Sequence, residues 1–474
     1  MNDRSHEMTA AAPEPTRSSL SSGGRLLVLV TAFLGWMCAG IHMSITSVAM
    51  RPAVTGLLHE TGALDRARFQ TLAKQEKAAV EAPQRQLSSA EKRQLDEWKT
   101  LVAKWFAWCQ CAFLFGAAAG GLCFGALGDR IGRSKGMALS ILTYSAMAGA
   151  AYYARQPQEL LVLWFLACMG VGGMWPTGVA LVSEAWSSLS RPVAAGLIGT
   201  SANIGIFLMA TAMTSTNPDL AVIPGHWRWV MLVAAAPLFL GIFSLIFVPE
   251  SPRWLALKSA ASRGLPSHTA HSEIFRPPLL GITLVGIALA TIPLFGGWGS
   301  ANWMVPWADE AGESASPPNP QLKAQVSQAR SVTGIVGSLL GGWIASALGR
   351  RLTYLLTSVC ALAVAQFTFW FVVPTDRHFL WCVSGLGFFS GIYFGWLPLC
   401  LPEMFPTRNR STGAGVSFNF GRILTAVTVF ATSTVMAYFA GDYAGLGRVT
   451  SLIFALGIVF IGLAPDTSRK QLQD

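Results

Sequence analysis

The chain has 474 residues, of which 52% are hydrophobic and 12% charged, and its mean hydropathy is +0.46. This balance excludes a soluble globular protein of this size and indicates a polytopic membrane protein. The net charge of +10 does not indicate nucleic-acid binding, because the basic residues are spread over short loops and form no single patch.

Twelve apolar stretches, each long enough to cross a bilayer, follow a polar tail at residues 1–24 that we expect to be disordered and cytoplasmic. A polar linker at 255–278 separates the sixth stretch from the seventh, a Pro-rich loop is expected at 308–328, and 468–474 form a second cytoplasmic tail. The expected spans are 26–50, 105–124, 137–154, 160–182, 192–214, 229–248, 279–303, 332–348, 352–373, 379–401, 412–439 and 449–463.

Residues 51–104, between the first two spans, are charged and rich in Ala and Gln. Pro83 interrupts this segment, and Ser88 with Glu91 forms a capping-box pattern ahead of the second span. We expect a helical hairpin outside the membrane whose mixed charges form a solvated face. The alternative is a partner surface or a cover over the outer mouth.

The turn 125–136 joins the second and third spans and is dense in glycines and charges. Glycines let helix ends approach closely, and Asp129 can pair with basic residues across the turn. A weaker copy follows at 342–351, the spacing 184–191 recurs at 403–410, and the turn 249–252 is echoed at 465–468. Three matched pairs in one order indicate a duplicated half, although a loop that only fixes topology remains the alternative.

These turns resemble the signature loops of the major facilitator superfamily, and the segments 249–254 and 402–410 resemble its sugar-porter, metabolite:proton symporter and aromatic-acid symporter branches. The resemblance implies an all-α membrane protein with twelve transmembrane helices in two pseudo-symmetric six-helix bundles, at 25–254 and 279–467. It also implies charge networks that hold the cytoplasmic side closed. The gating candidates are Gly125, Asp129, Arg130, Gly132, Arg133, Glu184, Arg191, Arg350, Arg351, Glu403, Arg408 and Arg410.

The basic residues concentrate in the turns assigned to the inside, which places both termini in the cytoplasm. Fewer are expected in the outer loops, Arg330 among them. Every Asp and Glu falls in a loop, a tail or a helix end, and Trp164 stands where the resembling family often has an arginine.

Two ionisable residues remain deep inside the spans, where such groups tend to be functional. Arg422 can clamp a substrate carboxylate, or can bond helix carbonyls for structure. His42 can take up a proton near neutral pH and couple it to transport, or can be a neutral ring that donates to a helix carbonyl.

Indole and amide groups suit a site for ring-bearing solutes, since they combine flat apolar area with a few oriented donors. Many of the tryptophans can instead be interfacial anchors. The candidates for contact with substrate are Trp36, Gln110, Trp175, Asn203, Trp298, Asn302, Trp303, Gln366, Tyr393, Trp396 and Asn419.

The eight cysteines lie in or beside apolar segments, where a small polarisable side chain packs well, so we expect no metal site and no cofactor. We predict a monomeric plasma-membrane transporter, not an enzyme, that moves an organic anion of aromatic or sugar-acid type by proton-coupled uptake. A porter of a neutral sugar or other metabolite, and a non-transporting solute sensor, are the alternatives.

Overall fold

The computed structural model describes residues 20–81, 87–186, 191–213, 222–262, 271–315, 319, 322–430 and 442–465. All regular structure in these ranges is helical. Eight of the described helices are long and apolar enough to cross a membrane, and Leu279–Phe295 is a shorter apolar helix. Most of the first expected tail, the whole of the second, and residues 431–439 of the eleventh expected span lie outside the described residues.

The N-terminal half is built around α6, which packs against α4 and α5, while α1 packs against α7. The sixth span is two short helices that break at Pro237, as expected where a proline follows a helical segment. The elements are α1 (Ser22–Val48), α4 (Ser89–Ile131), α5 (Arg133–Ala151), α6 (Pro157–Ala185), α7 (Arg191–Met213), α8 (Trp229–Ala235) and α9 (Leu238–Phe247).

The C-terminal half repeats this arrangement, with α13 packed against α15 and α11 packed against α16. Its elements are α11 (Leu279–Phe295), α12 (Met304–Ser314), α13 (Leu322–Ala347), α14 (Arg350–Phe371), α15 (Phe379–Met404), α16 (Arg410–Phe430), α18 (Tyr443–Thr450) and α19 (Ile453–Phe460). A π-helical turn at Gly296–Ser300 separates α11 from the helices that follow. The expected loop at 308–328 is therefore wrong in large part, since α12 and the start of α13 occupy it.

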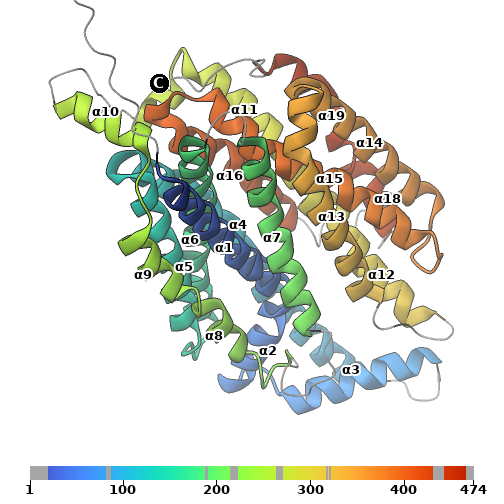
Figure 1. Ribbon diagram of the computed structural model, residues 1–474. Coiled ribbons are helices and arrows are strands. Elements are labelled where there is room, and N and C mark those ends of the chain that lie inside the picture. The colour runs from blue at the N-terminus through green and yellow to red at the C-terminus, as the bar shows by residue number, and fades with distance from the viewer. Residues whose placement is uncertain are drawn as a thin grey trace, which may run out of the picture.

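The halves meet along two seams, which we define by their helices. In the first, α7 packs against α13 and α15; in the second, α4 and α6 pack against α16 (Figure 1). Glycines permit both approaches, because a Cβ at Gly199 would overlap the Phe394 carbonyl and one at Gly415 would overlap the Gly121 carbonyl. Each seam therefore joins backbones at close range.

The segment 51–104 contributes to three helices rather than to the two of the expected hairpin. They are α2 (Met50–Glu60), α3 (Arg66–Glu81) and the first turns of α4. Ser88 caps α4 as expected, with Ser88 Oγ accepting from Glu91 N at 3.3 Å and Glu91 Oε2 accepting from Ser88 N at 3.1 Å. As a result α4 is one continuous helix of 43 residues. In Figure 1, α2 and α3 lie at the opposite end of the molecule from α10 (Pro252–Ser262).

Candidate functional site

The turn between α4 and α5 is a single residue, Gly132, whose φ of 121° favours glycine. Its counterpart Gly349 joins α13 to α14 with φ of 89°. The two halves therefore have a glycine with positive φ at corresponding turns, which agrees with the duplication that the repeated sequence indicates.

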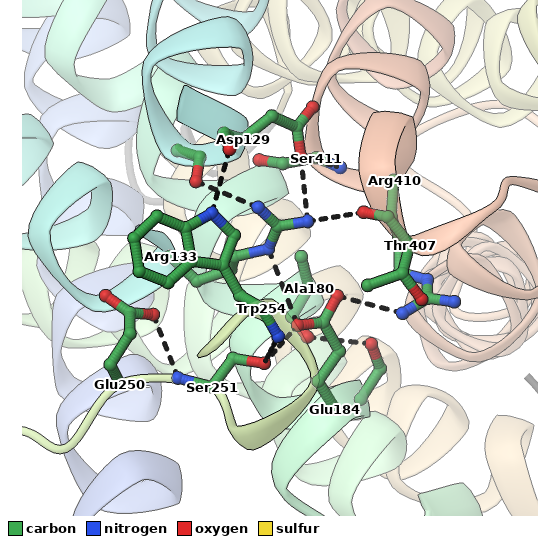
Figure 2. Close-up of polar contacts among 12 residues, drawn as sticks. Asp129, Arg133, Ala180, Glu184, Glu250, Ser251, Trp254, Thr407, Arg410 and Ser411 are labelled. Carbon is green, nitrogen blue, oxygen red and sulfur yellow. Dashed lines mark hydrogen bonds and ion pairs between the residues drawn. The ribbon is translucent and has the colours of Figure 1, made fainter. Parts of the chain in front are cut away.

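Arg133, the first residue of α5, has a fully buried side chain with two carboxylate partners. Its Nη2 lies 2.9 Å from Asp129 Oδ1, and its Nε lies 3.4 Å from Glu184 Oε2 (Figure 2). Its Nη1 also donates to the Gly128 carbonyl at 3.0 Å. Because these charges are buried together, removing one partner leaves another uncompensated.

The same cluster reaches across the second seam. Arg410 Nη1 donates to Glu184 Oε1 at 2.8 Å, and Arg133 Nη2 donates to the Thr407 carbonyl at 2.5 Å. Asp129 accepts from the backbone N–H groups of Ser411 at 3.2 Å and Thr412 at 2.8 Å, which are the first free donors of α16. A carboxylate there is stabilised by the helix dipole. We call Asp129, Arg133, Glu184 and Arg410 the ionic latch.

The segment 249–254 supports the latch from the end of α9. Glu250 Oε1 accepts from Ser134 N at 3.1 Å at the start of α5. Trp254 Nε1 donates to the Asp129 carbonyl at 2.8 Å (Figure 2). Ser251 Oγ donates to Glu184. This motif therefore holds the carboxylate of Glu184 and the backbone of Asp129 in place.

The second copy reproduces the pairing. Arg350 Nη2 lies 3.1 Å from Glu403 Oε1, and Arg350 Nη1 donates to the Ala345 carbonyl at 3.1 Å, as Arg133 does to Gly128. Arg351 Nε donates to the Ala464 carbonyl at 2.9 Å. The duplicated turns therefore hold the same kind of Arg–Glu pair in both halves.

The remaining gating candidates are Arg408, Arg130, Gly125 and Arg191. Arg408 is exposed and lies 3.3 Å from Glu273. Arg130 is exposed, and Gly125 packs close to the Ser411 carbonyl. The side chain of Arg191 lies outside the part of the structure that is described.

A pocket of about 70 Å³ lies between the two halves. This space holds only a few water molecules, well below the roughly 300–1,000 Å³ typical of ligand sites, so a solute requires the halves to separate here. The lining residues are Trp36, Met43, Gly199, Ala202, Asn203, Ile206, Leu294, Gly297, Arg330, Gly334, Gly387, Ser390, Gly391, Phe394, Phe418 and Arg422.

Arg422 lines this pocket. Its side chain is 4% exposed, and its Nη1 is buried with no hydrogen-bond partner among the described residues. The guanidinium lies 5.5 Å from the ring centres of Phe113 and Phe418, which come from opposite halves. Cation–π contact stabilises the charge without using its N–H donors.

Arg330 is a pocket residue that the sequence reasoning missed, and its expected place in an outer loop is wrong. It lies within α13, and its Nη1 is also buried with no hydrogen-bond partner in the described part of the chain. The polar start of α13 delayed the predicted span to residue 332. The predicted helix could have been started earlier, because Lys323 and Arg330 lie on the same face of one helix.

Among the other substrate-contact candidates, Trp36 and Asn203 line the pocket. Trp175 stacks on Phe418, with ring centres 3.8 Å apart and an interplanar angle of 8°. Asn419 Nδ2 donates across the second seam to the Gly172 carbonyl at 3.2 Å. Trp175 therefore lies behind the lining residue Phe418, and Asn419 joins the two halves at the second seam.

The remaining candidates are bonded elsewhere. Gln110 donates to the Thr46 carbonyl, Gln366 to the Arg448 carbonyl and Ser451 Oγ, and Trp396 Nε1 to the Arg350 carbonyl. Tyr393 bonds Ser358 Oγ at 2.7 Å in the core of the C-terminal half, and Trp303 lies near Tyr443. The side chains of Trp298 and Asn302 lie outside the described part of the structure.

His42 does not line the pocket, although the next residue, Met43, does. Its Nδ1 lies 2.9 Å from the Cys38 carbonyl, and its ring stacks on Trp164 at 5.9 Å between centres. The Nε2 atom is buried with no hydrogen-bond partner among the described residues. The geometry fits a histidine that donates through Nδ1 and has a free lone pair on Nε2.

Two helical halves that are latched at one end and enclose a small pocket lined by two arginines have the architecture of a membrane carrier. The family model described as Major Facilitator Superfamily matches residues 32–429. The chain therefore belongs to this superfamily, and it is a multi-pass secondary transporter of small organic solutes rather than an enzyme.

Similar proteins agree with this assignment. The chain is 27% identical over 365 residues to the cis,cis-muconate transport protein of Acinetobacter baylyi, covering 76% of this chain and 84% of the relative. It is 23% identical over 347 residues to the sialic acid transporter NanX of Escherichia coli, covering 72% of this chain and 80% of the relative. The fold matches the proton:xylose symporter XylE with a TM-score of 0.66 at 16% identity, covering 96% of this chain and 98% of that one. The predicted fold class is thus confirmed.

Proposed function

We propose that the protein carries a small organic anion, aromatic or sugar-acid in type, across the plasma membrane. The observation that carries this proposal is Arg422, a buried guanidinium on the central pocket with an unused donor. A carboxylate presents two coplanar oxygens that match the fork of a guanidinium. Relatives named for muconate and for sialic acid also favour an acid over a neutral sugar.

Transport proceeds by alternating access, with the ionic latch as the inner gate. The latch spans the second seam, so opening that end requires Glu184 to leave Arg410 and Asp129 to leave the first turn of α16. The start of α1 lies beside Pro249, at the end of the molecule that also carries α10 (Figure 1). The distribution of basic residues assigns this end to the cytoplasm.

Uptake is driven by protons, and His42 is the coupling group of this proposal. A buried imidazole with a free ring nitrogen can accept a proton, and His42 lies on α1, the helix that contributes Trp36 and Met43 to the pocket. The protein acts as a monomer, because the site is complete between the two halves of one chain.

The proposal is tested by counterflow in proteoliposomes that contain the purified protein. Vesicles are loaded with unlabelled benzoate, glucuronate or xylose, and entry of the same labelled compound is followed. We expect accelerated exchange of at least one acid and none of xylose. Exchange of xylose alone would reject an anion carrier, and binding of an acid with no exchange would instead indicate a solute sensor.

A further inference from the structure

The central pocket carries two cations, Arg330 from α13 and Arg422 from α16, and none of its described lining residues is acidic. Each guanidinium has a buried Nη1 with no hydrogen-bond partner among the described residues. An unpaired buried donor on a charged group is costly. Both arginines of this cavity carry this cost. A clamp for a single carboxylate needs only one arginine.

The two arginines belong to different seams. Arg330 lies on α13, which packs against α7 in the first seam, and Arg422 lies on α16, which packs against α4 in the second. Arg422 is also held by Phe113 of α4 through a cation–π contact. A ligand that bonds both guanidinium groups therefore contacts one helix of the first seam and one helix of the second.

Apart from Asn203, Ser390 and the two arginines, the lining is mainly apolar or lacks side chains. Leu294, Phe394 and Phe418 supply apolar surface, while Gly334 and Gly391 leave backbone exposed to the cavity. Such walls suit a carbon frame rather than a third charged group or a row of hydroxyls, which would need more polar partners. The charged groups of a fitting ligand must then lie at its ends.

We propose that Arg330 and Arg422 are paired anchors that make the pocket selective for organic dianions, with one carboxylate at each end of a short carbon frame. This inference rests on the proposed function as an organic anion carrier and names the substrate class of the same site. A monoanion satisfies one arginine and leaves the other unpaired, so the second carboxylate adds the worth of a charge-assisted hydrogen bond.

The test compares two acids that differ only in the second carboxylate: hexanedioate and hexanoate. Binding to the purified full-length protein in nanodiscs is measured by calorimetry. We expect hexanedioate to bind at least about tenfold more tightly, which corresponds to about 1.4 kcal/mol. Equal affinities for the two acids in the unaltered protein would overturn the inference without any variant.

Variants then assign the preference to its residue. Arg330→Gln should abolish the preference for hexanedioate while changing hexanoate affinity less than about threefold, and Arg330→Lys should keep part of it. Arg377→Gln, at an exposed arginine outside the pocket, is the matched control and should change nothing. A preference that survives Arg330→Gln would reject Arg330 as an anchor.

The failure of this inference is distinguishable from failure of the proposed function. If both acids bind equally and both exchange in proteoliposomes, the protein is an anion carrier with a single anchor. If neither of these acids binds while benzoate or glucuronate exchanges, the paired anchors are rejected and the anion carrier stands. If none of the four acids binds or exchanges, the anion carrier itself is rejected.

Discussion

Glu184 on α6 and Arg410 at the start of α16 form a 2.8 Å ion pair between the two halves, and both side chains are fully buried. Glu184 simultaneously faces Arg133 at 3.4 Å. One carboxylate thus balances two arginines at the point where the seam must open.

Glu184→Gln should weaken the closed state. The neutral amide leaves two buried guanidinium groups undercompensated, at a cost of about 3–5 kcal/mol. We expect amide hydrogen exchange of residues 405–416 to accelerate at least tenfold, measured by mass spectrometry on protein in nanodiscs. Glu159→Gln, an exposed position at the other end of α6, should leave exchange unchanged. Equal protection in both variants would show that the latch does not hold this end closed.

Gly132→Ala should destabilise the protein. The residue has φ of 121°, and a Cβ would overlap Glu250 Oε2, the acceptor for Ser134 N. Strain of this kind costs about 1–3 kcal/mol. The melting temperature in detergent should fall, whereas Gly281→Ala in α11, where a Cβ meets nothing within 4 Å, should not lower it. An unchanged melting temperature for Gly132→Ala would contradict the assigned backbone role.

Arg422→Gln should reduce affinity for a transported acid. Loss of a hydrogen bond to a charged group costs about 1.5–3 kcal/mol, or roughly 10- to 150-fold. Binding of benzoate or glucuronate, whichever exchanges in the counterflow assay, is measured by calorimetry, with Arg377→Gln as the control. An affinity within twofold of the unaltered protein would reject the carboxylate clamp.

His42→Ala should abolish accumulation of the acid under an imposed proton gradient yet spare exchange at equal pH. Exchange needs no net proton movement, so only the coupled reaction depends on the imidazole. Labelled uptake in proteoliposomes reports both reactions, and His378→Ala, at an exposed histidine, serves as the comparison. Accumulation that persists in His42→Ala would remove this residue from the coupling mechanism.

Local signals in the sequence predicted local structure well. The Ser88 and Glu91 pattern predicted the N-cap of α4, and the glycines of the turn 125–136 predicted a close approach of helix ends, where a Cβ at Gly136 would meet Gly128 at 2.8 Å. These features depend on a few neighbouring residues, so they can be predicted from the sequence alone.

Membership of the central pocket was harder to predict. Tyr393 and Trp396 are polar aromatics in mid-helix, yet they bond the core of the C-terminal half and not the pocket. Arg330 has the chemistry of a site residue, but the low hydropathy around it placed it outside the span. Which face of a helix meets the seam is decided by packing between distant segments, and no local pattern encodes it.

The continuity of α4 links the segment 51–104 to the ionic latch mechanically. A helix of 43 residues at about 1.5 Å per residue is roughly 65 Å long. Its capped start lies beside α3, where Lys99 pairs with Glu76, and its last turn carries Asp129. A displacement of the start of α4 that tilts this helix would shift the carboxylate that holds α16, so the segment 51–104 and the ionic latch are mechanically coupled.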